Sequence, residues 1–344
     1  MKNAVPEQLF RLAFTVSTCS HLGQAKVMAD SLVKYSPDYQ VIICLVDKLA
    51  NIDAADFAPH EIHEITAQQI PALHEAATRY TPFELTTMAK PFAGLYLLQK
   101  YADVSKLLYF DTDILFYGSV SPLEAMLDVS SIVISPHVAN GPRSRSYPHL
   151  REFLNSGTYN TGFWAVRRDE EAVAFLTWWS DRLVNEGYHN FTEGMFVDQL
   201  WFNLVPTLFK NVLVDNSLNH NVGYWNLHER TISKNAEGVY TVNGELPDGE
   251  LPDGELPLLF YHFSGYKLDH PAELSVHNQD YKLATLPALQ SLAGEYRRHL
   301  MANRHAHFLN IPNAYVRRRY FFQKITGLRR RLIRMCRAFL RLLE

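Results

Sequence analysis

The sequence predicts an α/β fold, in which a mostly parallel β-sheet carries helices on both faces and a helical extension follows at the C-terminus. The first observation behind this prediction is the order strand, helix, strand over residues 11–18, 20–35 and 39–47. The second is that these strands are apolar throughout, as in a sheet that is covered on both sides. The third is that strand and helix patterns keep alternating along the chain.

The later elements follow from the same patterns of apolar residues. We expect strands at 61–65, 107–110, 131–137, 212–214 and 258–262, and a strand that ends at 168. Helices are expected at 67–80 with an interruption near Pro71, at 82–101, 169–185 and 281–302, and in a short stretch from Ser121, and a hairpin is expected at 231–243. A tandem Gly-Glu-Leu-Pro repeat over residues 244–257 is expected to be a loop expansion. These elements predict one large domain over 8–275, a helical segment over 276–316 and a tail over 317–344.

Charge, cysteine content and the lack of long apolar runs indicate the cellular compartment of the protein. The net charge of −3 gives no reason to expect nucleic-acid binding. Cys19, Cys44 and Cys336 are far apart and form no Cys-x-x-Cys motif, so neither a disulfide framework nor a zinc ribbon is expected. No apolar run is long enough to span a bilayer, and residues 1–11 lack the apolar core of a signal peptide. These features predict a protein of the reducing cytoplasm.

The C-terminal tail, residues 317–344, differs from the rest of the chain. It contains nine Arg, one Lys and one Glu, a net charge of +9. Its apolar residues recur at helical spacing, with arginines on the opposite face. A basic amphipathic helix suits the anionic inner face of a membrane, so we expect peripheral binding there. Packing on the protein itself or on a second protomer is the alternative.

An Asp-x-Asp motif closes the apolar strand at 107–110. Because strand side chains alternate, Asp111 and Asp113 point the same way. Two adjacent carboxylates at the end of a buried strand are costly unless a positive charge lies between them. A divalent cation, Mn²⁺ or Mg²⁺, meets this need and can also hold a substrate diphosphate. The motif is short, and a solvated strand end is the alternative interpretation.

A second chemical motif follows the strand at 258–262. His262, Gly265 and Lys267 fall within six positions of one another. Imidazole suits Mn²⁺-type ions, glycine lets a phosphate approach the backbone, and lysine supplies a point charge for that phosphate. This spacing predicts a metal and diphosphate site, whereas a lone histidine after a strand is usually a satisfied core residue.

Other candidate residues are less distinctive. Thr15, Ser17 and Thr18 lie at the carboxyl end of the first strand, where α/β folds bind ligands, although ordinary turn chemistry explains them equally well. Lys90 precedes Pro91 inside a helix, which can turn its side chain inward, but a surface lysine is the favoured interpretation.

Two loops complete the candidate surface. Residues 139–148 contain Arg143 and Arg145 and can close over an anionic ligand, or form an ordinary surface loop. Residues 219–230 are rich in Asn, His, Tyr and Trp, which stack on sugars and bind hydroxyls. The acceptor candidates in this segment are Tyr224, Trp225, Asn226 and His228. A well-bonded core loop is the alternative.

Taken in order, these motifs resemble those of the GT-A glycosyltransferases, most closely the retaining family-eight enzymes of bacteria. The resemblance covers roughly residues 10–270. It rests on the strand that ends in Asp111-Thr-Asp113, on Asn160 and Gly162 before a strand, on Asp198-Gln199, and on His262, Gly265 and Lys267. The usual Lys-Pro-Trp after the glycine is absent, and the early aspartate of the family is replaced by Ser17-Thr18.

The resemblance implies a role for each matched residue. Asp111, Asp113 and His262 would bind the metal, with Asp111 also near the ribose. Asp198 and Gln199 would face the donor sugar as catalytic residues. The remaining donor-binding residues that it implies would be Lys90, Asn160, Gly162, Gly265 and Lys267. Thr15, Ser17 and Thr18 are added as donor-binding candidates from their place at the end of the first strand.

The implied activity is metal-dependent transfer of a hexose from a nucleotide-diphosphate sugar, with a UDP-sugar favoured. The acceptor would be a saccharide or glycan, in bacterial surface polysaccharide or glycoconjugate synthesis. Two other functions remain open from the sequence. One is a lectin-like scaffold that binds sugar nucleotides, and the other is an Asp-x-Asp phosphohydrolase.

Overall fold

A seven-stranded β-sheet forms the centre of the computed structural model, which describes residues 11–139, 150–246, 249–250 and 255–316 together with Leu332 and Met335. The strand order is β10-β6-β7-β4-β1-β2-β3. Its strands are β1 (Arg11–Ser17), β2 (Tyr39–Leu45), β3 (Glu61–Glu64), β4 (Lys106–Phe110), β6 (Ile132–Pro136), β7 (Tyr159–Arg167) and β10 (Val212–Val214). All neighbouring pairs are parallel except those of β7, which runs antiparallel to β4 and β6. The predicted mostly parallel sheet is confirmed.

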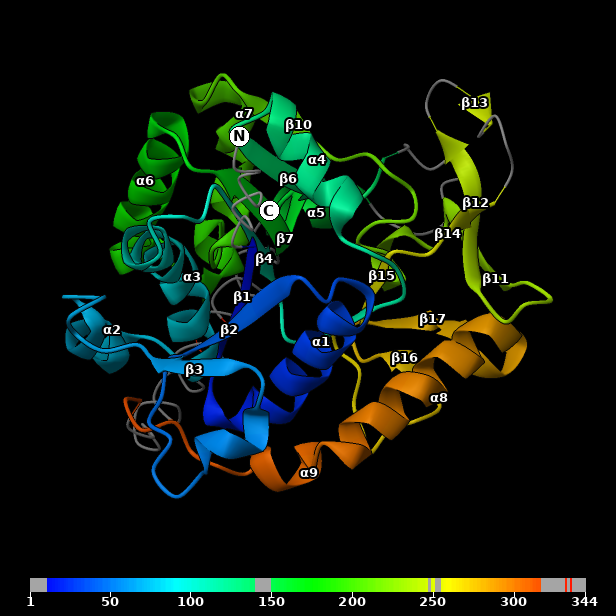
Figure 1. Ribbon diagram of the computed structural model, residues 1–344, viewed down its shortest axis with the longest axis horizontal. Coiled ribbons are helices and arrows are strands. Elements are labelled where there is room, and N and C mark those ends of the chain that lie inside the picture. Colours follow the sequence, from blue (N-terminus) through cyan, green and yellow to red (C-terminus); the bar gives the residue numbers. More distant parts are fainter. Residues whose placement is uncertain are drawn as a thin grey trace, which may run out of the picture.

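Helices cover both faces of this sheet, as the apolar strands predicted. In β1, Leu12 and Phe14 pack on one face and Ala13 on the other, because strand side chains alternate. The first face is covered by α2 (Leu73–Arg79), α3 (Pro82–Lys100) and α6 (Glu170–Glu186), and the second by α1 (Leu22–Tyr35) and α4 (Ser121–Val129). Figure 1 shows α3 and α6 on the opposite side of the sheet from α1.

A short antiparallel pair continues the chain beyond β4 and brings a distant segment to its end. β5 (Ile114–Phe116) directly follows the Asp-x-Asp motif and pairs with β15 (Phe260–His262). In this register His262 lies opposite Ile114, the residue after Asp113. The backbone pairing therefore brings the side chain of His262 to the carboxyl end of β4.

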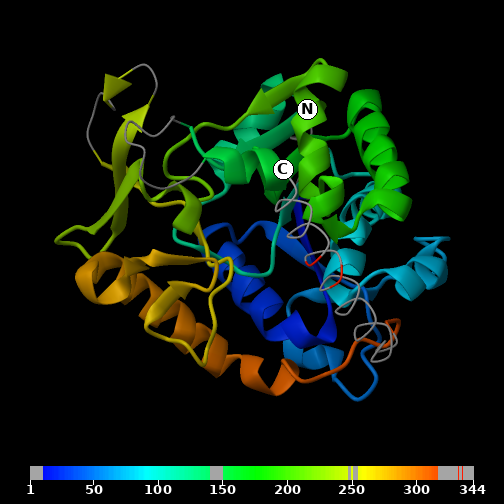
Figure 2. The ribbon, with the colours of Figure 1, turned by 180° about the vertical axis from the view of Figure 1, so that it is seen from behind.

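A second apolar core joins the hairpin of β11 (Arg230–Lys234) and β12 (Tyr240–Leu246) to α8 (Pro287–Ala302). The hairpin stands at the end of the molecule away from α6 in both views (Figures 1 and 2). The tandem repeat was expected to be only a loop. This expectation is wrong for its described residues, which extend β12 and form β13 (Gly249–Glu250) and β14 (Leu256–Pro257), both paired with β12.

Two predicted helices are shorter than the pattern suggested. The helix expected at 67–80 with an interruption near Pro71 begins after that proline, at Leu73. The one expected at 281–302 begins at Pro287, after the strand Asn278–Lys282 and a 3₁₀ turn at Leu283–Thr285. Proline lacks an N–H group and has a fixed φ, so it suits the first turn of a helix better than its interior. By contrast, α3 runs through Pro91.

The remaining short elements are α5 (Leu150–Ser156), α7 (Val205–Leu208), α9 (His305–Phe308), β8 (His189–Asn190), β9 (Met195–Phe196) and β16 (Glu273–Ser275). Among the described residues, no helix combines the length and the apolar character that crossing a bilayer requires. The predictions for Arg143 and Arg145, and for the tail 317–344 apart from Leu332 and Met335, lie outside the described residues.

Candidate metal centre

Asp111, Asp113 and His262 meet where β4 and β15 end. One ligand atom from each lies within 4.8 Å of the others. The closest pair is Oδ1 of Asp113 and Nε2 of His262, 3.0 Å apart, and Oδ2 of Asp111 lies 4.0 Å from the same nitrogen. His262 is buried, while the two aspartates are partly exposed. The structure therefore brings these three residues together from two strand ends, with the two aspartates partly exposed to solvent.

Two carboxylates and an imidazole suit a divalent ion such as Mn²⁺ or Mg²⁺. Burial by itself raises the pKa of Asp113, but His262 outweighs it and the net effect is a lowered pKa. For His262, burial by itself lowers the pKa, but the carboxylate of Asp113 outweighs it and the net effect is a raised pKa. Asp113 therefore holds a negative charge, and a positive charge is favoured opposite it. A metal ion would replace the proton of His262 in that role.

A hydrogen-bond network fixes the orientation of the His262 ring. Its Nδ1 lies 3.2 Å from Oδ1 of Asn221, which can only accept, so Nδ1 carries the hydrogen and Nε2 faces the aspartates. Asn221 has a left-handed backbone (φ +44°), and its amide nitrogen donates to Oδ1 of Asn160 at 3.1 Å. The ring of Trp225 also packs perpendicular to that of His262, with 5.1 Å between centroids.

Gly162 is required by the same ring. A Cβ atom at this position would lie 2.2 Å from Cε1 of His262, a distance that real contacts do not reach. The amide of Gly162 donates to Oδ1 of Asn160, and its carbonyl accepts from the amide of Asp111. Asn160 and Gly162, expected to bind the donor, thus lie behind a metal-ligand candidate and hold it in place.

Lys90 lies on the other side of Asp111. Its Nζ is 3.1 Å from Oδ1 of Asp111 and 3.0 Å from Oδ2 of Asp198, and its side chain is 4% exposed. The favoured surface interpretation of Lys90 is therefore wrong. The physical reason is that the adjacent Met88 and Ala89 face the sheet core, so this part of α3 has no solvent side. Burial lowers the pKa of Lys90, but the two carboxylates outweigh it and raise the pKa.

Asp198 and Gln199 follow β9 at the start of a 3₁₀ helix, Gln199–Leu204. The preceding Val197 has φ +39°, a strained conformation for a β-branched residue. Asp198 is 1% exposed, and burial raises the pKa of its carboxyl while Lys90 opposes that shift. The amide nitrogen of Gln199 donates to the carbonyl of Ser156 at 2.7 Å, which leaves its oxygen as the atom able to meet a ligand.

The diphosphate candidates lie after His262. Gly265 has φ +75°, and a Cβ there would come within 2.5 Å of both His277 and Ser275. Lys267 is exposed. Burial lowers the pKa values of His21, His277 and His305, and the charge of Lys267 lowers each of them further. Lys267 therefore lies within electrostatic range of three histidines that the sequence patterns did not single out.

The residues at the carboxyl end of β1 are all buried. Oγ1 of Thr15 has no hydrogen-bond partner among the described residues, whereas Oγ of Ser17 donates to the carbonyl of Thr18. Oγ1 of Thr18 lies 3.2 Å from Nδ1 of His21. Local hydrogen bonds of the turn thus engage the hydroxyls of Ser17 and Thr18, while the hydroxyl of Thr15 takes no part in them.

The acceptor candidates divide into two pairs. Trp225 and Asn226 are buried, and the side-chain amide of Asn226 bonds the amide of Gly223 and the carbonyl of Asn221. They shape the loop that carries Asn221 to His262. Tyr224 and His228 are partly exposed, and the Tyr224 ring lies 6.1 Å from that of His277. Sequence reasoning missed Asn221, although an asparagine in a segment dense in Asn and His is a signal for a left-handed turn.

No family model matches the chain. It is similar to two uncharacterised proteins of Bacillus subtilis (strain 168), YfnF and YfnD. YfnF is 25% identical over 74% of this chain and 81% of its own length, and YfnD is 26% identical over 74% of this chain and 77% of its own length.

Among solved structures, the chain resembles the galactosyltransferase LgtC in complex with donor and acceptor sugar analogues. The TM-score is 0.51 and the identity 15%, over 85% of this chain and 95% of LgtC. An active-site mutant of LgtC gives a TM-score of 0.51 with 16% identity, over 83% of this chain and 95% of that one.

At this level of identity the likeness to LgtC concerns the fold alone. The central sheet, with helices on both of its faces, is that of the GT-A glycosyltransferases. The expected fold class is therefore confirmed.

Proposed function

We propose that this chain is a metal-dependent glycosyltransferase. It would move a hexose from a nucleotide-diphosphate sugar, with a UDP-sugar favoured, to a saccharide or glycan acceptor with retention of configuration. The observation that carries this proposal is the cluster of Asp111, Asp113 and His262, in a GT-A fold, at the strand ends where α/β proteins bind ligands. Mn²⁺ or Mg²⁺ is the ion that this donor set would hold.

The diphosphate is the part of the donor that gains negative charge when the sugar leaves. A bound divalent ion would stabilise that charge. Asp111, Asp113 and His262 would position the ion, and Lys267 would contribute a second positive charge from the exposed side. Gly265, with its left-handed backbone, would let a phosphate approach the main chain closely. Thr15, Ser17 and Thr18 would contact the nucleoside at the end of β1.

Asp198 is proposed to stabilise the positive charge that develops on the sugar. The ammonium of Lys90, 3.0 Å away, favours the ionised carboxylate of Asp198 despite its burial. Gln199 would present its side-chain oxygen to the same face of the sugar, since its amide nitrogen is bonded to Ser156. In a retaining reaction an oxygen of the departing phosphate takes the acceptor proton. Tyr224 and His228 are the acceptor candidates that remain partly exposed.

The cellular role is proposed from the sequence. Residues 8–275 would form the transferase domain, 276–316 a helical extension, and 317–344 a basic helix that binds the anionic inner face of the plasma membrane. A cytoplasmic enzyme held at that surface suits the synthesis of bacterial surface polysaccharides or glycoconjugates.

The proposal is tested by thermal shift with UDP-, GDP-, ADP- and dTDP-sugars in the presence of Mn²⁺, followed by release of the nucleoside diphosphate from the donor that stabilises most. Asp113→Ala and His262→Ala should each lower that release by at least about 100-fold, because each loses a metal ligand. Asp181→Ala and His299→Ala change exposed residues and serve as controls. Normal rates in the two site variants, or tight donor binding without turnover on a panel of acceptors, would rule out the proposed activity.

A further inference from the structure

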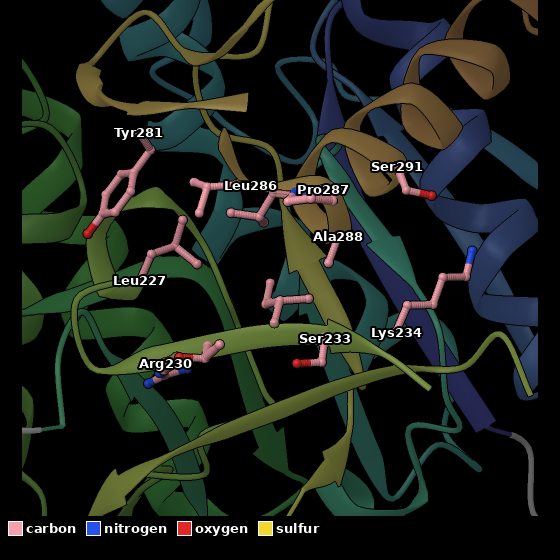
Figure 3. Close-up of a pocket in the computed structure, with 12 residues that line it drawn as sticks. Leu227, Arg230, Ser233, Lys234, Tyr281, Leu286, Pro287, Ala288 and Ser291 are labelled. Atoms are coloured by element: carbon pink, nitrogen blue, oxygen red, sulfur yellow. The ribbon is translucent and has the colours of Figure 1, made fainter. Parts of the chain in front are cut away.

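A pocket lies apart from the candidate metal centre, between β11 and the start of α8. Its volume is about 590 Å³, within the range of small-molecule sites. Side chains of β11 face those of the first turn of α8 across it (Figure 3). The lining residues are Leu227, Arg230, Thr231, Ile232, Ser233, Lys234, Tyr281, Leu286, Pro287, Ala288, Leu289 and Ser291.

The pocket is apolar along most of its length. Four of the lining side chains are aliphatic: Leu227, Ile232, Leu286 and Leu289. Tyr281 is the one aromatic residue in the lining. Sugars are bound by aromatic faces and by dense hydrogen bonding, whereas aliphatic walls favour a hydrocarbon. The walls therefore indicate a ligand with an apolar chain.

One end of the pocket is polar and positive. Lys234 and Ser291 point toward the same end in Figure 3. Nζ of Lys234 lies 4.5 Å from the centre of the Tyr240 ring, and the Tyr240 hydroxyl donates to Ser291 at 2.9 Å. None of the lining residues is acidic, and the first turn of α8 contains no acid that would oppose an anion.

The second cation of the lining is already engaged. The guanidinium of Arg230 is buried, donates to the carbonyls of Leu218 and His220, and pairs with Glu229. The charge of Lys234, by contrast, is on an exposed side chain. The pocket thus offers one accessible positive charge next to an aliphatic wall, which is complementary to an amphiphilic anion.

The pocket also adjoins the metal centre along the chain. Leu227 follows the 3₁₀ turn Tyr224–Asn226, whose Trp225 contacts the ring of His262. Leu227 is two positions after Trp225, so their Cα atoms are at most about 7.6 Å apart. The wall of the pocket at Leu227 therefore continues into the loop that supports His262, which also carries Tyr224 and His228.

We infer that this pocket binds the phosphate-linked hydrocarbon end of a lipid-linked saccharide acceptor, with the phosphate at Lys234 and Ser291 and the chain along the leucines. The acceptor role rests on the proposed function, while binding of the amphiphile does not. The sugar end of such an acceptor would extend past Leu227 toward the metal centre.

Binding is tested by calorimetric titration of the full chain with dodecyl phosphate below its micelle concentration. Ala288→Trp fills the pocket and should lower the affinity at least 10-fold. Lys234→Ala, an exposed change with little risk to folding, should lower it about 10-fold through loss of a charged hydrogen bond. Ala302→Trp, at the exposed end of α8, and Lys210→Ala, on a distant surface, are matched controls that should bind normally.

Several outcomes would overturn the inference. Equal affinity for inorganic phosphate would show a simple anion site, and equal affinity for dodecyl maltoside would show that the charge is not recognised. Unchanged binding of dodecyl phosphate by Ala288→Trp would place it elsewhere. This titration needs neither metal nor donor, so it is independent of the proposed activity.

The acceptor role has its own test. Ala288→Trp should raise KM at least 10-fold for a saccharide linked to dodecyl phosphate, with no change in KM for the same saccharide without the chain or in nucleoside diphosphate release from the donor alone. Equal effects on both acceptors would overturn the acceptor role and leave a lipid-phosphate site.

Discussion

The two sides of the candidate site balance their charges differently. On one side Lys90 bridges Asp111 and Asp198, and the side chains of Lys90 and Asp198 are only 4% and 2% exposed. On the other side Asp113, 22% exposed, faces His262 across 3.0 Å. The first side is an ion cluster that the protein closes with its own buried ammonium group, and its Asp111 is 29% exposed. The second side pairs a partly exposed carboxylate with a buried imidazole and suits an external cation.

This difference assigns separate tasks to the two aspartates of the motif. Asp111 shares its charge between Lys90 and the metal candidate site, whereas Asp113 contacts His262. Breaking the ion cluster of the first side leaves an uncompensated buried charge and costs stability, while altering the second side should change metal affinity with less effect on folding. The three predictions below test this separation.

The largest effect is expected on the first side. Lys90→Met should lower the free energy of unfolding by about 3–5 kcal/mol, because the carboxylate of Asp198 would remain buried without its partner. Urea denaturation measures this change. Lys100→Met, an exposed lysine on the same helix, is the control. Adding Asp198→Asn to Lys90→Met should recover part of the loss, and an unchanged single variant would show that the cluster is not needed for folding.

An intermediate effect is expected on the second side. Gly162→Ala places a methyl group against the ring of His262 and should lower Mn²⁺ affinity about 10–100-fold, the range for residues that orient a metal ligand. Calorimetric titration with Mn²⁺ measures it without any turnover. Gly294→Ala, where the new methyl group has room, is the control. Unchanged Mn²⁺ affinity of Gly162→Ala would separate His262 from the metal.

The smallest effect concerns pH. Burial lowers the pKa of His137 to about 4, and this residue lies behind His262, next to Asn160 and Trp225. The unfolded chain therefore binds more protons than the folded chain between pH 4 and 6.5, so stability falls as pH decreases through that window. From pH 7 to 5.5 the loss from His137 is at most about 1.4 kcal/mol. His137→Gln should flatten this slope in urea denaturation, and an equal slope would show that His137 protonates without penalty.

The sequence patterns predicted more of the fold than of the site. Apolar runs such as residues 107–110 identify buried strands from local composition, so the parallel sheet could be predicted. The break near Pro71 was also predictable, because proline disturbs a helix interior. The helix start at Pro287 was not predictable, because the preceding residues form a strand pairing that the pattern does not show.

Within the site, the closeness of Asp111 and Asp113 was predictable because they directly follow the apolar run 107–110, two positions apart. They lie in the turn between β4 and β5, so the expected alternation along one strand is not what orients them. The place of Lys90 was not predictable, because its helical pattern fits a surface lysine as well as a buried one. Its burial follows from the packing of α3 on the sheet, and its charge is compensated by Asp198, a residue far away in the sequence. The role of Gly162 could not be predicted either. Gly162 lies within β7 and not before it as expected, and the sequence does not reveal which side chain occupies the space left by its missing Cβ.

By itself, the sequence determined that two acidic residues end a buried strand and that a histidine ends another, because both facts follow from local periodicity. Only the tertiary structure decided that these strand ends meet, through the antiparallel register of β15 with β5. It also decided that a buried lysine neutralises one carboxylate and leaves the other to face the histidine. Long-range pairing sets which charges share a low-dielectric space, and local patterns carry no information about that.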